Sequence, residues 1–307
     1  MQITVTDVDK SYGSVIALDG LTLEIPADST FGVLGTNGAG KSTLFKILVG
    51  LDQADAGEIT IGSHPIKSAG PTLREAIGYL PEQVGFPGTL TGREILKFHA
   101  DMRGLSAAGR IDMALETVGL DPAAITRSVD GYSNGMRKRL GLATTLVAEP
   151  DILLLDEPTA GLDPRGVAEF HRIIDRIRHD TGATVILSSH VLSEIERLCD
   201  QVVIMHEGKS LLETAISDLK NQAHVTIFIV PSQSEDQADL LNIGAAVGQV
   251  ERRNEGVEIY CPVTSVPKAF AAMEGVVKPT SVRIEQKALE EVFHAALAEN
   301  YAQGVEH

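Results

Sequence analysis

The segment that decides the fold is a glycine-rich loop between two apolar runs. Its sequence is Gly35-Thr36-Asn37-Gly38-Ala39-Gly40-Lys41-Ser42-Thr43. Residues 31–34 precede it with the composition of a buried strand, and residues 44–49 follow it with apolar side chains at helical spacing. A strand, a glycine loop and a helix in this order form the context that a phosphate-binding P-loop requires.

The chemistry of this loop predicts a bound nucleoside triphosphate. Its glycines allow backbone N–H groups to turn inward around an anion, because glycine adopts such conformations at little steric cost. The following helix directs its positive N-terminus at the same point. Lys41 is then placed to reach the β- and γ-phosphates, and the Ser42 hydroxyl to bind Mg²⁺. The alternative is a glycine-rich turn that happens to precede Lys-Ser, and the flanking strand and helix disfavour it.

Composition limits the other classes of function. The chain of 307 residues suffices for one large domain or two ordinary ones. Its 26 basic and 42 acidic side chains give a net charge of −16, which argues against a nucleic-acid-binding surface. Cys199 and Cys261 have no C-x-x-C spacing and predict neither a zinc site nor a disulfide framework. We expect both thiols to be reduced and buried.

The sequence predicts no membrane-spanning segment. It contains no apolar run of the roughly 18 residues that such a helix needs. The N-terminal residues lack the basic region and apolar core of a signal peptide. We therefore expect a cytoplasmic protein that exerts any membrane role through a partner.

Two further apolar runs end in residues that carry chemistry. Residues 152–155 lead into Asp156 and Glu157, and residues 184–189 lead into His190. Open α/β sheets bind ligands at the carboxyl ends of such buried parallel strands. Asp156 is placed to hold Mg²⁺ or its waters, and Glu157 is the candidate base for an attacking water. A solvated acidic turn and a structural histidine are the alternatives.

The N-terminal part predicts a hairpin within residues 3–25, with Tyr12 in the turn before its second strand. An exposed ring there either stacks on an adenine or has no role, and the residue alone does not decide between the two. Residues 77–81 predict a buried strand that ends at Glu82 and Gln83.

The character changes to helices over residues 84–147. One helix begins at Thr91, where Glu94 completes a capping box, and another spans residues 111–118. A later helix contains the basic triplet 137–139, which we interpret as a solvated face rather than a nucleic-acid site.

In combination these motifs resemble the nucleotide-binding subunit of an ATP-binding-cassette (ABC) transporter, over residues 1 to about 219. The resemblance rests on their order, which is far more specific than any one motif. Besides the P-loop, Asp156-Glu157 and His190, the matching segments are Tyr12 at the adenine-stacking position, Tyr132-Ser133-Asn134-Gly135-Met136 in place of Leu-Ser-Gly-Gly-Gln, and Ala160-Gly161-Leu162-Asp163 as the D-loop. The resemblance implies an α/β, RecA-like P-loop NTPase core with an antiparallel β subdomain and a helical subdomain.

The resemblance also implies a mechanism in which two copies pack head to tail. Ser133 and Gly135 of one copy would close on the γ-phosphate held by the P-loop of the other. Glu157 would polarise the attacking water, His190 would contact the γ-phosphate, and Asp163 would link the two sites. The nucleotide-binding residues of the P-loop would be Gly35, Asn37, Gly38, Ala39, Gly40, Lys41, Ser42 and Thr43.

The implied protein is thus an ATPase with ATP and Mg²⁺ as ligands. It would work as a homodimer on the cytoplasmic face of the membrane and drive a separate transmembrane permease. The helical region would hold that partner's short cytoplasmic helices.

The sequence departs from the family pattern at two places. Asn134 and Met136 replace the usual Gly and Gln of the signature, and we expect phosphate contact to survive through the residues that remain. The Q-loop glutamine is represented by Glu82, with Gln83 one position later, and either could bind Mg²⁺ or its water. Residues 78–82 look like the drug- and polysaccharide-export branch. A fuller run, through residue 137, is similar to the ATPase that serves nitrous oxide reductase maturation.

The ABC pattern ends near Asp218, and residues 219–307 predict a small α+β, ferredoxin-like domain. The expected order is strand-helix-strand-strand-helix-strand, followed by a final helix. The strands are expected at 225–231, 247–253, 257–262 and 282–285, and the helices up to Leu241, at 265–273 and at 287–301. We interpret this domain as a dimer support or docking module, since it contains no phosphate loop or metal spacing.

A soluble ABC protein that acts on DNA or the ribosome is the main alternative function. Such proteins usually carry two cassettes or long coiled coils and basic surfaces, whereas this sequence has one cassette, no heptads and a net charge of −16. A P-loop fold kept only for binding is disfavoured by Glu157 and His190.

Overall fold

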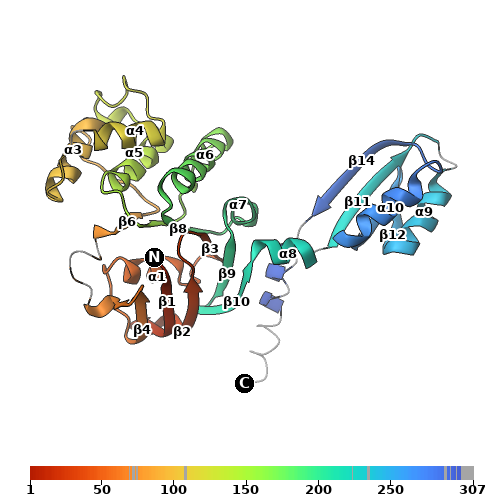
Figure 1. Cartoon of the computed structure of the whole chain (residues 1–307), viewed down its shortest axis with the longest axis horizontal. Coiled ribbons are helices and arrows are strands. Elements are labelled where there is room, and N and C mark those ends of the chain that lie inside the picture. Colours follow the sequence, from red (N-terminus) through yellow and green to blue (C-terminus); the bar gives the residue numbers. More distant parts are fainter. Residues whose placement is uncertain are drawn as a thin grey trace. The chain divides into compact units, whose positions relative to one another are not determined.

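The chain folds into two compact units, Met1–Glu213 and Thr214–His307, and divides close to the boundary expected after Asp218. Figure 1 shows the computed structural model, which describes residues 1–68, 70, 73, 75–106, 109–222, 224–233, 236–286, 289–290, 292–294 and 296–298. Each unit has its own cluster of buried apolar side chains. Within these described ranges, no helix is long and apolar enough to cross a membrane.

A six-stranded sheet with the strand order β10-β9-β3-β8-β7-β6 lies at the centre of the first unit. β3 pairs in parallel with β8 and β9, and β7 pairs in parallel with β6 and β8. Every residue of β3, β7 and β8 is buried, as the apolar runs predicted. The strands are β3 (Thr30–Gly35), β6 (Ile77–Leu80), β7 (Ile152–Leu155), β8 (Thr184–Ser189), β9 (Gln201–His206) and β10 (Lys209–Ala215).

A second sheet of the same unit has the order β2-β1-β4-β5 and pairs its strands antiparallel. The predicted N-terminal hairpin is therefore confirmed, although Tyr12 is the last residue of β1 rather than part of the turn. Apolar residues of this sheet share one core with helix α1 (Lys41–Leu48), which follows the glycine loop. The strands are β1 (Ile3–Tyr12), β2 (Val15–Ile25), β4 (Ala56–Ile61) and β5 (His64–Pro65), with a short 3₁₀ helix η1 (Ile66–Ser68) after them.

Three helices pack against one another beside the central sheet and form the helical region expected for residues 84–147 (Figure 1). The capping box is confirmed, because Thr91 Oγ1 accepts from Glu94 N and the Glu94 carboxylate accepts from Thr91 N. The helices are α3 (Gly92–Met102), α4 (Arg110–Val118) and α5 (Asn134–Leu146), with the 3₁₀ helix η2 (Val129–Gly131) before α5.

Two more helices complete this unit, α6 (Pro164–Thr181) and α7 (Leu192–Leu198). α7 packs closely on β3 at Gly32, where an added Cβ would lie 2.8 Å from Ile195 Cγ2. Cys199, which follows α7, is buried and free, as expected.

The basic triplet in α5 is not a solvated face, which corrects the sequence interpretation. Lys138 is 3% exposed and donates to the backbone oxygen of Glu157. Arg139 pairs with Glu169 at 2.9 Å. A buried cation needs a specific partner, so Lys138 has a structural or functional task.

The second unit contains a four-stranded antiparallel sheet in the order β12-β13-β11-β14, with helices α9 and α10 between its strands along the chain. The strand expected from Val247 begins later, because Val247 is the last residue of α9. The helix expected at 287–301 is only partly within the described residues. The elements are α8 (Ile216–Gln222), β11 (His224–Pro231), α9 (Asp236–Val247), β12 (Gln249–Arg252), β13 (Val257–Pro262), η3 (Val263–Ser265), α10 (Val266–Met273) and β14 (Pro279–Gln286).

The sheet of the first unit generates a stability prediction. Leu154 lies in the middle of β7 and is 0% exposed, so Leu154→Ala should leave a cavity and lower the free energy of unfolding by about 2–5 kcal/mol. Leu51→Ala is the matched control, since Leu51 is 71% exposed and its truncation should change that free energy by less than about 0.5 kcal/mol. Urea denaturation followed by circular dichroism measures both, and equal effects would contradict the assigned core.

Candidate functional site

The glycine loop connects β3 to α1 in a conformation that its glycines permit. Gly38 and Gly40 have φ angles of 86° and 102°, in the left-handed region that favours glycine. At Gly40 an added Cβ would also lie 2.5 Å from the Ala17 carbonyl oxygen. Gly40 is the N-cap of α1 and provides no side-chain hydrogen bond. The first-turn N–H groups therefore have no side-chain acceptor and face a potential anion.

Lys41 is buried at the base of this loop, with 6% of its surface exposed. Its Nζ donates to the carbonyl oxygens of Gly35 at 2.7 Å and of Thr36 at 3.2 Å. It also lies 3.2 Å from Glu157 Oε1. The loop and the end of β7, distant in sequence, therefore meet at one cation.

Asp156 and Glu157 emerge from the carboxyl end of β7 and are held by one hydroxyl of β8. Ser188 Oγ donates to Asp156 Oδ1 at 2.7 Å and accepts from Glu157 N at 2.8 Å. Asp156 and Glu157 are only 3% and 8% exposed. Burial and these contacts fix two carboxylates side by side at the carboxyl end of β7.

His190 follows β8 and orients the Glu157 carboxylate. Its Nδ1 lies 2.8 Å from Glu157 Oε2. The other oxygen, Oε1, is buried, and it faces Lys41 Nζ at 3.2 Å without a hydrogen-bond partner among the described residues. The two oxygens of Glu157 are thus directed at His190 and at Lys41.

Lys41 and Glu157 line a cleft of about 440 Å³ in the first unit. It brings together most of the predicted residues of the loop and its surroundings. Its lining consists of Tyr12, Val15, Ile16, Ala17, Asn37, Gly38, Ala39, Gly40, Lys41, Ser42, Thr43, Glu82 and Glu157.

Tyr12 lies at one end of this cleft and is 46% exposed. Its hydroxyl donates to Asp52, whose other oxygen pairs with Lys10 at 2.9 Å. The hydrogen bond to Asp52 raises the pKa of Tyr12, and the same bond is the main reason that the pKa of Asp52 falls to about 2. The ring is thus anchored by its polar end while much of its surface stays accessible.

Glu82 and Gln83 follow β6 and diverge. Glu82 lines the cleft, whereas Gln83 lines an apolar groove of about 530 Å³ beside α3 and α5. The sequence left open whether Glu82 or Gln83 is the Q-loop residue, and in the structure the two side chains line different cavities.

The signature and D-loop residues are absent from the lining of this cleft. Ser133 is the N-cap of α5 and accepts from Met136 N at 3.3 Å. Asp163 is the N-cap of α6 and accepts from Gly166 N at 2.7 Å. Gly135 lies next to Leu162, with 3.7 Å between an added Cβ and Leu162 Cδ2. Within one chain, the phosphate loop and the signature segment thus line different surfaces.

Sequence reasoning missed two groups that support the site. Ser188 was only part of an apolar run, although a hydroxyl two residues before His190 was a usable signal. Glu194 was not singled out. It is 7% exposed and accepts from Thr159 at 2.8 Å and from Ser189 at 2.9 Å.

Glu194 is held as a carboxylate behind the catalytic face. Burial raises its pKa, but the His171 ring at 3.7 Å and the hydrogen bonds from Thr159 and Ser189 outweigh this, and the net shift is downward. This contact set ties α7 to α6 and to the segment after Glu157.

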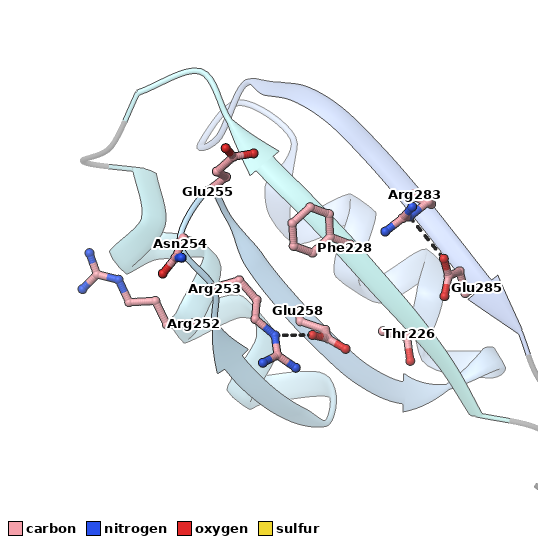
Figure 2. A pocket seen from close by; sticks show the side chains of 9 residues that line it. All are labelled: Thr226, Phe228, Arg252, Arg253, Asn254, Glu255, Glu258, Arg283 and Glu285. Carbon is pink, nitrogen blue, oxygen red and sulfur yellow. Dashed lines mark hydrogen bonds and ion pairs between the residues drawn. The ribbon is translucent and has the colours of Figure 1, made fainter.

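A third concavity, of about 530 Å³, lies on the open face of the C-terminal sheet (Figure 2). Arg283 pairs with Glu285, and Arg253 pairs with Glu258 (Figure 2). Its charges therefore compensate one another, and it lacks the convergent cations of a phosphate site.

Comparisons with known proteins place the chain among ABC proteins. The family model described as "ABC transporter" matches residues 18–160. The bacitracin transport ATP-binding protein BcrA of Bacillus licheniformis is 42% identical over 221 residues, which cover 72% of each chain. The daunorubicin resistance ATP-binding protein DrrA3 of Streptomyces coeruleorubidus is 34% identical over 306 residues, covering 95% of this chain and 94% of that protein.

Solved structures give the same result for the first part of the chain. CbiO1 from Clostridium perfringens, part of the ABC transporter complex CbiONQ, superposes with a TM-score of 0.64 at 30% identity. The match covers 71% of this chain and 89% of the CbiO1 chain. The dimeric ATP-binding cassette MJ0796 bound to ADP and Pi shares the fold, with a TM-score of 0.64 at 22% identity. The match covers 70% of this chain and 98% of the MJ0796 chain. The glycine loop, the paired carboxylates and the histidine thus occur in a P-loop ATPase fold, and the chain belongs to the ATP-binding subunits of ABC transporters.

Proposed function

We propose that this ATPase works as a head-to-tail homodimer that hydrolyses Mg-ATP at the interface and drives export through a separate permease. The observation that carries the proposal is the division of the site described above. The cleft contains Lys41 and Glu157, whereas Ser133 at the N-terminus of α5 lies outside its lining. A second copy supplies the missing donors when its α5 closes on the triphosphate.

Within this site the P-loop and Lys41 bind the β- and γ-phosphates, and Tyr12 stacks on the adenine. Glu157 accepts the proton of the attacking water through Oε1, which is buried and leaves its 3.2 Å ion pair when Lys41 turns to the phosphates. His190 holds the other oxygen at 2.8 Å and lies where it can contact the γ-phosphate. Catalysis of this kind consists mainly of positioning and charge stabilisation.

The donor set fits Mg²⁺, a hard cation that takes oxygen ligands. Among the described residues, Asp156 Oδ2 has a single, long contact of 3.4 Å with the Tyr79 hydroxyl, so it has lone pairs to offer. Ser42 and Glu82 line the nucleotide cleft, and Glu82 rather than Gln83 is the proposed Q-loop ligand. Bound there, the cation would neutralise charge that develops on the phosphates.

The apolar groove beside α3 and α5 is the proposed seat of the permease. Its lining includes Gln83, Val84 and Phe98, and Phe98 is 57% exposed. Pro81 and Gln83, the two sequence neighbours of Glu82, both line the groove, so a partner helix bound there adjoins the nucleotide cleft. The protein is then peripheral on the cytoplasmic face of the membrane. Export as the direction is supported by a relative that is 38% identical over 217 residues, the Nod factor export ATP-binding protein I of Paraburkholderia xenovorans.

For the second unit we propose a ferredoxin-like domain, which acts as an accessory module of the ATPase spanning about residues 1–218. The strand order β12-β13-β11-β14 with antiparallel neighbours supports this assignment, since β11-α9-β12 and β13-α10-β14 then form two interleaved units.

The dimer is tested with Glu157→Gln. This change removes the base and keeps the shape, so the variant should bind Mg-ATP, lose more than about 99% of turnover, and accumulate as an ATP-dependent dimer on gel filtration. Lys41→Ala should remove nucleotide binding and form no such dimer. Retention of Glu157→Gln as a monomer under saturating Mg-ATP would contradict the head-to-tail arrangement.

The groove is tested with Phe98→Asp. A buried charge in an apolar interface is costly, so this variant should lose most of its co-sedimentation with membranes of the native cell. Its ATPase activity as a purified chain should stay within about twofold of the wild type. Met113→Asp is the control, because Met113 is 61% exposed on α4 and does not line this groove. Equal membrane binding by all three proteins would refute the assignment.

The domain boundary is tested by ending the chain after Asp218. Among the described residues, the buried apolar cluster that joins the two sheets to α1 contains none beyond Met205, so the shortened chain should unfold in one cooperative urea transition and still bind ATP. Loss of both properties would show that the two units fold only together.

A further inference from the structure

Helix α5 binds both ends of the turn that carries the catalytic carboxylate. Asn134 Nδ2 donates to the Gly161 carbonyl oxygen at 2.9 Å, and Lys138 Nζ donates to the Glu157 carbonyl oxygen at 2.8 Å. Residues four apart on a helix lie on one face, one turn from each other. The two side chains thus hydrogen-bond to the first and the last residue of the segment from Glu157 to Gly161.

Lys138 is unusual for a surface-type residue because it is 3% exposed. Burial lowers its pKa, and the nearby carboxylates of Glu82, Glu157, Glu194 and Asp156 offset part of that effect. A buried ammonium is costly unless it is bound, and the Glu157 carbonyl is the hydrogen-bond acceptor that it reaches. Lys138 therefore binds the turn after β7 and is not part of the solvent-exposed surface of α5.

The turn needs such support at Glu157. Its φ of 44° is left-handed, which is disfavoured for a residue with a side chain and persists only where its surroundings impose it. Ser188 holds the Glu157 N–H from the sheet, and Lys138 holds the Glu157 carbonyl from the helical region. The carboxylate direction is fixed by this pair of backbone contacts together with His190.

Asn134 supplies the second contact from the signature segment itself. The sequence has an amide there in place of the family's glycine, which has no side chain to donate. Gly161 has a φ of 73°, and an added Cβ would lie 3.0 Å from Asn134 Nδ2. The amide and the turn are therefore closely fitted, and Asn134 lies one residue from Ser133, the N-cap of α5.

We propose that Asn134 and Lys138 form a clamp through which α5 positions Glu157 for catalysis. The consequence of this clamp rests on the proposed head-to-tail dimer. In that dimer, Ser133 of one chain contacts the triphosphate in one site, while Lys138 of the same helix positions Glu157 in the other site. Closure of α5 on one nucleotide is then transmitted, along one rigid helix, to the carboxylate that acts on the second. Lys138 and Asn134 are positioning residues and touch no reacting atom.

The clamp is tested first with Lys138→Met in the full chain. Methionine has a similar length and apolar character but no donor, so folding and thermal midpoint should be retained. The turnover number kcat should fall roughly ten- to a hundredfold, the cost of a misplaced catalytic group, while KM and the Kd for a fluorescent ATP analogue stay within about twofold. Because it binds ATP normally but hydrolyses it slowly, the variant should also accumulate as a dimer under Mg-ATP.

Lys138→Gln restores a donor on a shorter side chain and should recover part of the lost kcat. Lys97→Met is the matched control, because Lys97 on α3 is 63% exposed and pairs with Asp101. This control should keep the wild-type kcat. A kcat of Lys138→Met equal to that of the wild type, or no recovery in Lys138→Gln, would overturn the clamp.

Asn134→Ala provides a second route that does not disturb a buried position. It should lower kcat less than Lys138→Met does, and the double variant should be slower than Lys138→Met by less than about twofold, since both contacts hold one segment. Fully multiplicative losses would show that the two side chains act independently and would refute the clamp. Wild-type protein that neither hydrolyses ATP nor yields a Glu157→Gln dimer would instead refute the proposed function.

Discussion

The site depends on the register of four parallel strands. Leu155 of β7 lies opposite Leu80 of β6 and Leu187 of β8, and Leu34 of β3 lies opposite Ser189 of β8. β6 and β7 end opposite each other, β8 continues two residues further to the level of Leu34, and the residues that follow these strands emerge at the same end of the sheet. A strand advances about 3.3 Å per residue, so a slip of one position would carry a carboxylate out of hydrogen-bond reach of its neighbours. Burial of β3, β7 and β8 on both faces makes such a slip costly.

Much of this arrangement could be predicted because its determinants are local. The glycine loop has a sequence that few other structures need, and four consecutive apolar residues before Asp156 suffice to indicate a buried strand. The Thr91–Glu94 capping box is likewise a short-range pattern, and it is present as expected. Family resemblance added the order of the motifs, and the comparisons with known proteins support the same assignment.

The supporting contacts could not be predicted because they join segments far apart in the sequence. Lys138 reads as one of three surface cations, and only the approach of α5 to the end of β7 shows that it is buried. The choice between Glu82 and Gln83 depends on how the chain turns after Leu80, which neither residue type determines. In the second unit the shift of a strand start past Val247 has the same origin, since an apolar β-branched residue is compatible with the end of a helix and with a strand.

The shared hydroxyl of Ser188 has a consequence for how this enzyme can change. One oxygen atom donates to Asp156 and accepts from the backbone of Glu157, so both acids take their reference position from a single point on β8. Any substitution that moves this strand alters the two acids together. On the proposed function, cation binding by Asp156 and the orientation of the Glu157 base would therefore change together.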